Sequence, residues 1–131
     1  CEKIMYAGLG MVTPAHTHGE KKEDIICRSG LLTLTLWKEN PREQAPAGSV
    51  EVRINGEVRT YASGESFVLH PGERITLTPG LWHEFAPAAE ETLIGEVSTW
   101  CDEAKDNFFA DPEVDIFHSI EPDEPAEFSG F

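Results

Sequence analysis

The chain has 131 residues, a hydrophobic content of 40% and a formal net charge of −14. These values are typical of a folded globular protein, and the length predicts one domain that covers residues 1–131. So acidic a chain disfavours nucleic acids and polyanionic substrates, and no apolar run approaches the roughly 20 residues of a membrane span.

Short segments with strand-like composition follow one another from the N-terminus. Residues 2–8, 11–18 and 23–30 are the first three predicted strands. In residues 31–37 leucine and threonine alternate, which is the period-2 pattern of a half-buried strand. Residues 38–49 hold two prolines and a glycine and form a predicted loop.

The clearest local prediction is a β-hairpin over residues 50–61. Two alternating runs flank Asn55-Gly56, a dipeptide that suits the positive φ angles of a type I′ turn. Further strands are expected at 65–69, 74–80, 83–87 and 92–100, and no long apolar stripe has helical spacing. The pattern favours an all-β sandwich or barrel over about residues 1–100.

Residues 101–131 form a different, acidic segment. From residue 102 onward it holds ten acidic side chains and one basic side chain. We expect a short helical turn and then an extended tail. Because the segment also keeps five phenylalanines, part of it should dock near the mouth of the barrel.

The three cysteines, Cys1, Cys27 and Cys101, show no C-x-x-C spacing. A disulfide framework and a structural zinc knuckle are therefore disfavoured, and a reducing cytoplasm is the simplest location. The chain starts at Cys1 rather than at methionine, so we expect it to begin inside a longer gene product or after processing.

A cluster of potential metal ligands lies in residues 15–24. His16 and His18 are separated by one residue, so on a strand both imidazoles point to the same face. Glu23 can return toward them across a turn, and His83 lies on a later strand after Pro79-Gly80. Two imidazoles and a carboxylate suit manganese, iron, cobalt, nickel or zinc. A lone H-x-H is a weak signal, and exposed histidines beside lysines are common.

The surrounding glycines strengthen this prediction. The stretch from Gly10 to Gly30 resembles the first motif of the cupin superfamily, whose members are small jelly-roll barrels with a metal at the mouth. The stretch from Gly72 to His83 is similar to the second cupin motif, although it lacks the closing asparagine. The resemblance implies a single cupin-type jelly-roll β-barrel with an extended, partly docked C-terminal tail.

Longer stretches narrow the resemblance. "VTPAHTHGEKKEDIICRSG", "ITLTPGLWHEF", "GEVS" and "IEPDEP" resemble the D-lyxose ketol-isomerase family in wording, order and spacing. The resemblance implies a divalent metal, typically manganese, and interconversion of D-lyxose with D-xylulose and of D-mannose with D-fructose. It also implies that His16, His18, Glu23 and His83 are metal ligands and that Lys21 is an active-site lysine.

The chemistry of such an isomerase is coherent with these residues. A proton moves between C1 and C2 through an enediol, and a direct hydride shift is the alternative route. Lys21 is placed to act on the sugar oxygens, although without the family it would be read as a solvated lysine. Glu121 and Glu124 are candidate bases if the tail folds over the barrel mouth, and Glu96 could face the cavity or form a structural ion pair.

Two other functions stay open at this stage. One is a non-catalytic sugar- or metal-binding cupin, which is favoured by the absence of the segment that precedes the barrel in longer family members. The other is an iron-dependent cupin oxygenase, because three histidines and a glutamate also serve that chemistry. The expected partners are a neutral monosaccharide and a second copy of the chain in a homodimer.

Overall fold

The computed structural model describes residues 1–100, 102 and 104–114, and in these residues it contains strands and turns but no helix. No helix in this part of the chain could therefore cross a membrane. The strands are β1 (Glu2–Ala7), β2 (Thr13–Thr17), β3 (Glu23–Ser29), β4 (Leu32–Trp37), β5 (Ser49–Ile54), β6 (Glu57–Ala62), β7 (Ser66–Leu69), β8 (Arg74–Leu77), β9 (Trp82–Pro87), β10 (Thr92–Ser98) and β11 (Phe108–Phe109).

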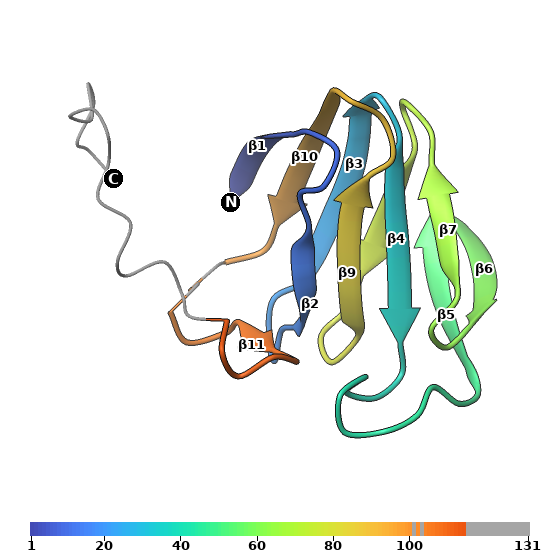
Figure 1. Ribbon diagram of the computed structural model, residues 1–131, viewed down its shortest axis with the longest axis vertical. Coiled ribbons are helices and arrows are strands. Elements are labelled where there is room, and N and C mark those ends of the chain that lie inside the picture. The colour runs from blue at the N-terminus through green and yellow to red at the C-terminus, as the bar shows by residue number, and fades with distance from the viewer. Residues whose placement is uncertain (101, 103, 115–131) are drawn as a thin grey trace.

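The strands form two antiparallel sheets that face each other (Figure 1). The first has six strands in the order β1-β10-β3-β8-β5-β6, and the second has five in the order β11-β2-β9-β4-β7. Neighbours in both sheets are mostly distant in sequence, which is typical of a double-sheet jelly roll. The prediction of an all-β fold of the cupin type is confirmed.

The space between the sheets is apolar at one end and polar at the other. Each strand turns alternate residues inward, so in β3 Glu23, Ile25 and Cys27 all face the interior. The apolar core comes from both sheets and consists of Ile25, Cys27, Leu32, Leu34, Leu36, Val50, Val52, Ile54, Leu69, Ile75, Leu77, Phe85 and Ile94. Glu23 and His83 continue the same inward rows at the polar end.

The predicted hairpin is confirmed. Strands β5 and β6 pair in antiparallel register around Asn55 and Gly56, which have φ angles of 51° and 87°. The predicted loop at residues 38–49 also matches, since β4 ends at Trp37 and β5 begins at Ser49. Because such turns depend on neighbouring residues alone, the sequence identifies them well.

The sequence did not predict strand β11. Residues 104–106 form a turn, and the Asp106 N–H donates to the Asp102 carbonyl, as in one turn of helix. Phe108 and Phe109 then pair with Thr17 and His16 at the edge of the second sheet. A two-residue strand has no detectable alternation, and here the pairing depends on the exposed edge of β2.

Gly30 provides a specific test of the fold, because both its φ angle and its close neighbours require a glycine. Its φ angle is +76°, and a Cβ atom would lie 2.3 Å from the Glu91 carbonyl oxygen. Gly72 also has a positive φ, +89°, but a Cβ there meets nothing within 4 Å. We expect Gly72→Ala to lower the free energy of unfolding by about 1–2 kcal/mol through backbone strain alone.

Gly30→Ala should cost at least about 2 kcal/mol more than Gly72→Ala, because the clash is with backbone that cannot move freely. Urea unfolding followed by tryptophan fluorescence measures both values. Equal losses in the two variants would show that Gly30 is required only for its φ angle.

Candidate functional site

Three histidines and one glutamate converge at the polar end of the interior. His16 lies on β2, His18 follows directly after that strand, His83 lies on β9, and Glu23 begins β3. His16 and His83 are register partners in one sheet, whereas Glu23 belongs to the other. One potential ligand atom from each side chain lies within 4.8 Å of the other three. The site therefore joins the two sheets.

Each of the three imidazoles is oriented by a backbone carbonyl. The Nδ1 atoms of His16, His18 and His83 lie 2.7, 2.6 and 3.0 Å from the carbonyl oxygens of Pro14, Asp106 and Leu81. Because a carbonyl only accepts, each Nδ1 carries the proton and donates it. The Nε2 atoms are left with their lone pairs, which is the tautomer of a metal-bound histidine.

The unpaired ligand atoms fit a metal ion. His18 Nε2, His83 Nε2 and Glu23 Oε1 are buried and have no hydrogen-bond partner of good geometry within the described part of the chain. Both Nε2 atoms nevertheless lie close to Glu23 Oε1, at 3.4 and 3.0 Å. Buried polar atoms are normally satisfied, so this convergence indicates a cation-binding centre. Three nitrogen ligands and one oxygen ligand suit a divalent first-row metal.

Glu23 is charged although it is only 2% exposed. Burial alone would raise its pKa, but His18 and His83, which donate to Oε1 from Nε2 when their imidazoles are protonated, and the ammonium of Lys21 outweigh that effect and hold the pKa well below its usual range. Lys21 Nζ lies 2.7 Å from Glu23 Oε2. The two carboxylate oxygens therefore face different partners, Oε1 the imidazoles and Oε2 the lysine.

Lys21 is buried between two carboxylates. Its Nζ lies 3.1 Å from Glu96 Oε1 as well as near Glu23. Burial would lower the pKa of Lys21, but the two carboxylates raise it above the usual value, so the amine is protonated at neutral pH. The reading of Lys21 as a solvated lysine is therefore wrong.

Glu96 faces the interior and also forms ion pairs, so both readings of this residue hold. Lys3, on β1, reaches the same Glu96 oxygen at 3.1 Å. Sequence reasoning missed Lys3. The alternation along β1 could have identified it, because Lys3 occupies the same inward-facing row as Met5 and Ala7.

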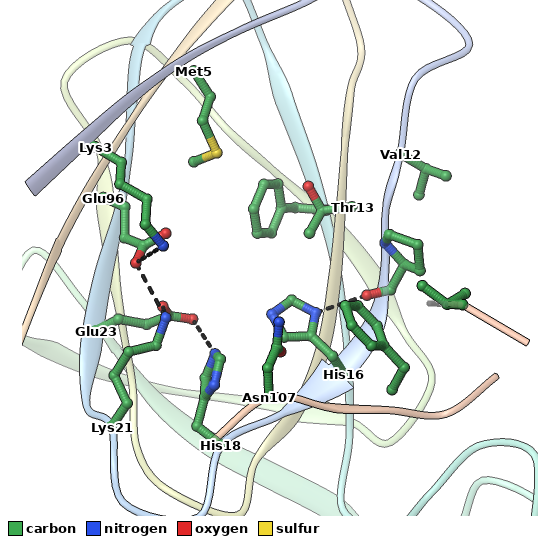
Figure 2. Close-up of a pocket in the computed structure, with 14 residues that line it drawn as sticks. Lys3, Met5, Val12, Thr13, His16, His18, Lys21, Glu23, Glu96 and Asn107 are labelled. Atoms are coloured by element: carbon green, nitrogen blue, oxygen red, sulfur yellow. Dashed lines mark hydrogen bonds and ion pairs between the residues drawn. The ribbon is translucent and has the colours of Figure 1, made fainter. Parts of the chain in front are cut away.

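A cavity of about 500 Å³ opens beside these groups, which is the size of a small-molecule site. Figure 2 shows Lys3, Glu96 and Glu23 along one side, with Thr13 and Val12 opposite. Asn107 also lines the cavity, and its buried amide oxygen has no hydrogen-bond partner among the described residues. Sequence reasoning missed Asn107 too, and nothing in its neighbourhood marks it as different from a turn residue.

Of the predicted site residues, the structure brings His16, His18, Lys21, Glu23 and His83 together. Glu121 and Glu124 lie outside the described residues. The acidic segment does approach the site through residues 106–109, because Asn107 and Phe109 line the cavity.

The comparisons of sequence with known proteins point to one family. The sequence profile of the D-lyxose isomerase family matches residues 1–129. The D-lyxose/D-mannose isomerases of Escherichia coli O157:H7 and Serratia proteamaculans are 41% and 39% identical to this chain over 96% and 97% of its length. The chain spans a little more than half of these relatives, 56% and 57%.

Among solved structures, L-ribose isomerase of Acinetobacter sp. DL28 in complex with L-ribose has a TM-score of 0.61. It is 15% identical, and the match covers 86% of this chain and 59% of that one. This likeness shows the shared fold.

The environment of His16 predicts an acid-dependent loss of stability in the metal-free protein. Burial, and then the neighbouring imidazole of His83, lower the pKa of His16 from 6.5 to about 3. In the unfolded chain His16 therefore binds a proton near pH 6.5, whereas in the folded chain it does so only near pH 3. The contribution of neutral His16 to the free energy of unfolding is complete above pH 6.5 and is lost as the pH falls toward 3.

Between pH 6.5 and 4.5, His16 should contribute about 2 kcal/mol of this loss, and Glu23, with its lowered pKa, contributes only below that window. Urea unfolding of the EDTA-treated protein at several pH values measures the slope. His16→Gln should flatten it, whereas the exposed His70→Gln should not. An unchanged slope in His16→Gln would contradict the assignment.

Proposed function

The chain belongs to the D-lyxose isomerase family, and on this premise we propose that it is a metal-dependent aldose–ketose isomerase. The proposed reaction interconverts D-lyxose and D-xylulose, with D-mannose and D-fructose as a second pair. Support comes from the names of its relatives, which are D-lyxose/D-mannose isomerases. The observation that carries the proposal is the buried set of three imidazoles and one carboxylate beside a cavity.

We propose that His16, His18, Glu23 and His83 hold the metal. Manganese is the ion expected for the family, and the same donors accept zinc, iron, cobalt or nickel. When bound, a divalent ion polarises the sugar carbonyl and lowers the pKa of the adjacent hydroxyl. Glu23 offers one oxygen for this role, since its other oxygen is paired with Lys21.

The residues of the chain supply the rest of the proposed chemistry. Lys21, protonated between Glu23 and Glu96, is suited to donate a proton or a hydrogen bond to the sugar oxygens. Lys3 shares Glu96 and lines the same cavity, so it is a second candidate for this role. Proton transfer between C1 and C2 also requires a carboxylate base, for which we retain Glu121 and Glu124.

The cavity favours a neutral ligand. Lys3 and Lys21 are matched by Glu96 and Glu23 within ion-pair distance, so these four groups bring no net charge to the wall. Thr13 and Asn107 offer polar atoms for sugar hydroxyls, while Met5, Phe85 and Phe109 cover apolar faces. A homodimer remains a prediction.

Metal binding is the first test. We expect about one Mn²⁺ per chain after metal repletion, because four ligand atoms converge on one point. His83→Gln should lower the Mn²⁺ affinity at least about 100-fold, since a directly bound ligand matters at least as much as its supporting partners. Titration followed by electron paramagnetic resonance measures the affinity, with His70→Gln as the matched control. No bound metal in the unmodified chain would contradict the proposal.

Isomerisation in D₂O is the second test. The Mn²⁺-loaded chain should interconvert D-lyxose with D-xylulose and D-mannose with D-fructose, and NMR should show deuterium entering at C1 or C2. Lys21→Met should reduce turnover about 100-fold or more. It should keep the metal, because all four proposed ligands remain. The exposed neighbour variant Lys22→Met should behave as the unmodified chain.

The other outcomes of this test are equally informative. Lost turnover in Lys3→Met with full turnover in Lys21→Met would assign the role to Lys3. Metal and sugar binding without isomerisation would favour the non-catalytic cupin. Oxygen consumption by the iron-loaded protein would favour the oxygenase.

A further inference from the structure

Asp106 lies just before β11 and holds the loop that follows β2. Its Oδ1 accepts the N–H of Gly19 at 2.7 Å and its Oδ2 accepts that of Lys21 at 2.8 Å. The N–H of Glu20 points between them, at 3.1 and 3.2 Å from the two oxygens. Three consecutive N–H groups thus converge on one carboxylate, which is the strong, charge-assisted form of such hydrogen bonds.

The main chain of the same residue makes a fourth contact. His18 Nδ1 donates to the Asp106 carbonyl oxygen at 2.6 Å. All of residues 18–21 are therefore bonded to Asp106, and this segment begins with a proposed metal ligand and ends with Lys21. Asp106 itself is neither one of the four proposed ligands nor one of the residues that line the cavity.

The approach of the two segments is close. A Cβ atom at Gly19 would lie 3.0 Å from Asp106 Oδ1 and 3.6 Å from the ring of Phe108. The glycine thus lets the loop backbone reach the carboxylate. On the other side, β11 pairs with β2, which anchors Asp106 two residues from a sheet.

We propose that Asp106 is a positioning residue for the metal and the lysine, an inference that rests on the proposed function. Its carbonyl holds His18 in the tautomer that directs the Nε2 lone pair toward Glu23. Its carboxylate holds the backbone of residues 19–21, so that Lys21 enters between Glu23 and Glu96. His16 and His83 need no such support, because both lie within strands.

The substitution Asp106→Asn tests this role. An amide keeps the size but replaces one acceptor oxygen with a donor, which opposes one of the three N–H groups. The segment should then detach and release His18 Nδ1. We expect a Mn²⁺ affinity about 10- to 100-fold weaker, which is the usual effect of losing a ligand's supporting partner.

Asp111→Asn is the matched control. Asp111 lies on the same segment and loses the same charge, but it pairs with Arg42 and accepts the N–H of Glu113, away from residues 18–21. Its Mn²⁺ affinity should equal that of the unmodified chain. Equal affinities in Asp106→Asn and Asp111→Asn would overturn the proposal.

Two NMR readouts in the metal-free protein separate positioning from a general structural role. Imidazole ¹⁵N shifts should show His18 in one tautomer, with the proton on Nδ1, and a mixture of tautomers in Asp106→Asn. The amide protons of Gly19, Glu20 and Lys21 should be protected from exchange in the unmodified chain and lose protection in the variant, while β4 and β9 keep theirs.

If Asp106→Asn does not fold, the amide measurement in the unmodified chain still tests the proposal. Rapid exchange at all three amides there would by itself refute the proposed contacts. If the unmodified chain binds no Mn²⁺, the proposed function fails. The tautomer and amide measurements then still decide whether Asp106 positions His18 and Lys21.

Discussion

A buried carboxylate, Glu23, is the group on which the arrangement of the site depends. It comes from one sheet and meets the imidazoles of His18 and His83, which are attached to the other. An isolated charge in that position would be strongly destabilising. The ammonium of Lys21 balances one oxygen of Glu23, and a divalent cation held by Oε1 and the imidazole nitrogens would balance the other.

The same inward-facing rows of side chains build both the core and the site. In β3 the row changes from Cys27 and Ile25 to Glu23, and in β9 it changes from Phe85 to His83. A shift of one residue in the pairing of either strand would turn its ligand outward and its core residues into solvent. The free energy that fixes the register of the apolar core therefore also fixes the geometry of the proposed metal centre.

The segment after β10 completes the site from outside the two main layers. Through β11 it adds an edge strand beside His16, and through Asp106 and Asn107 it contacts the 18–21 loop and the cavity. The carboxylate of Asp106 in this acidic segment accepts hydrogen bonds from the backbone N–H groups of Gly19 and Lys21. Residues 106–110 therefore pack against β2 and the loop that follows it, and they are not a solvated acidic extension.

The sequence by itself determined the features that depend on neighbouring residues: the alternating strands, the Asn55-Gly56 hairpin, and His16 and His18 directed to one side. The turns that follow His18 and precede His83 made Glu23 and His83 candidate ligands, the flanking glycines strengthened that prediction, and the family resemblance added Lys21. The pairing of Lys3 and Lys21 with Glu96, the burial of Lys21 and the contacts of Asp106 were decided by the tertiary structure alone. The pairs Lys3–Glu96, Lys21–Glu96 and His18–Asp106 join residues at least 75 positions apart. The charge state and orientation of such groups depend on partners that only the packing of the two sheets brings together.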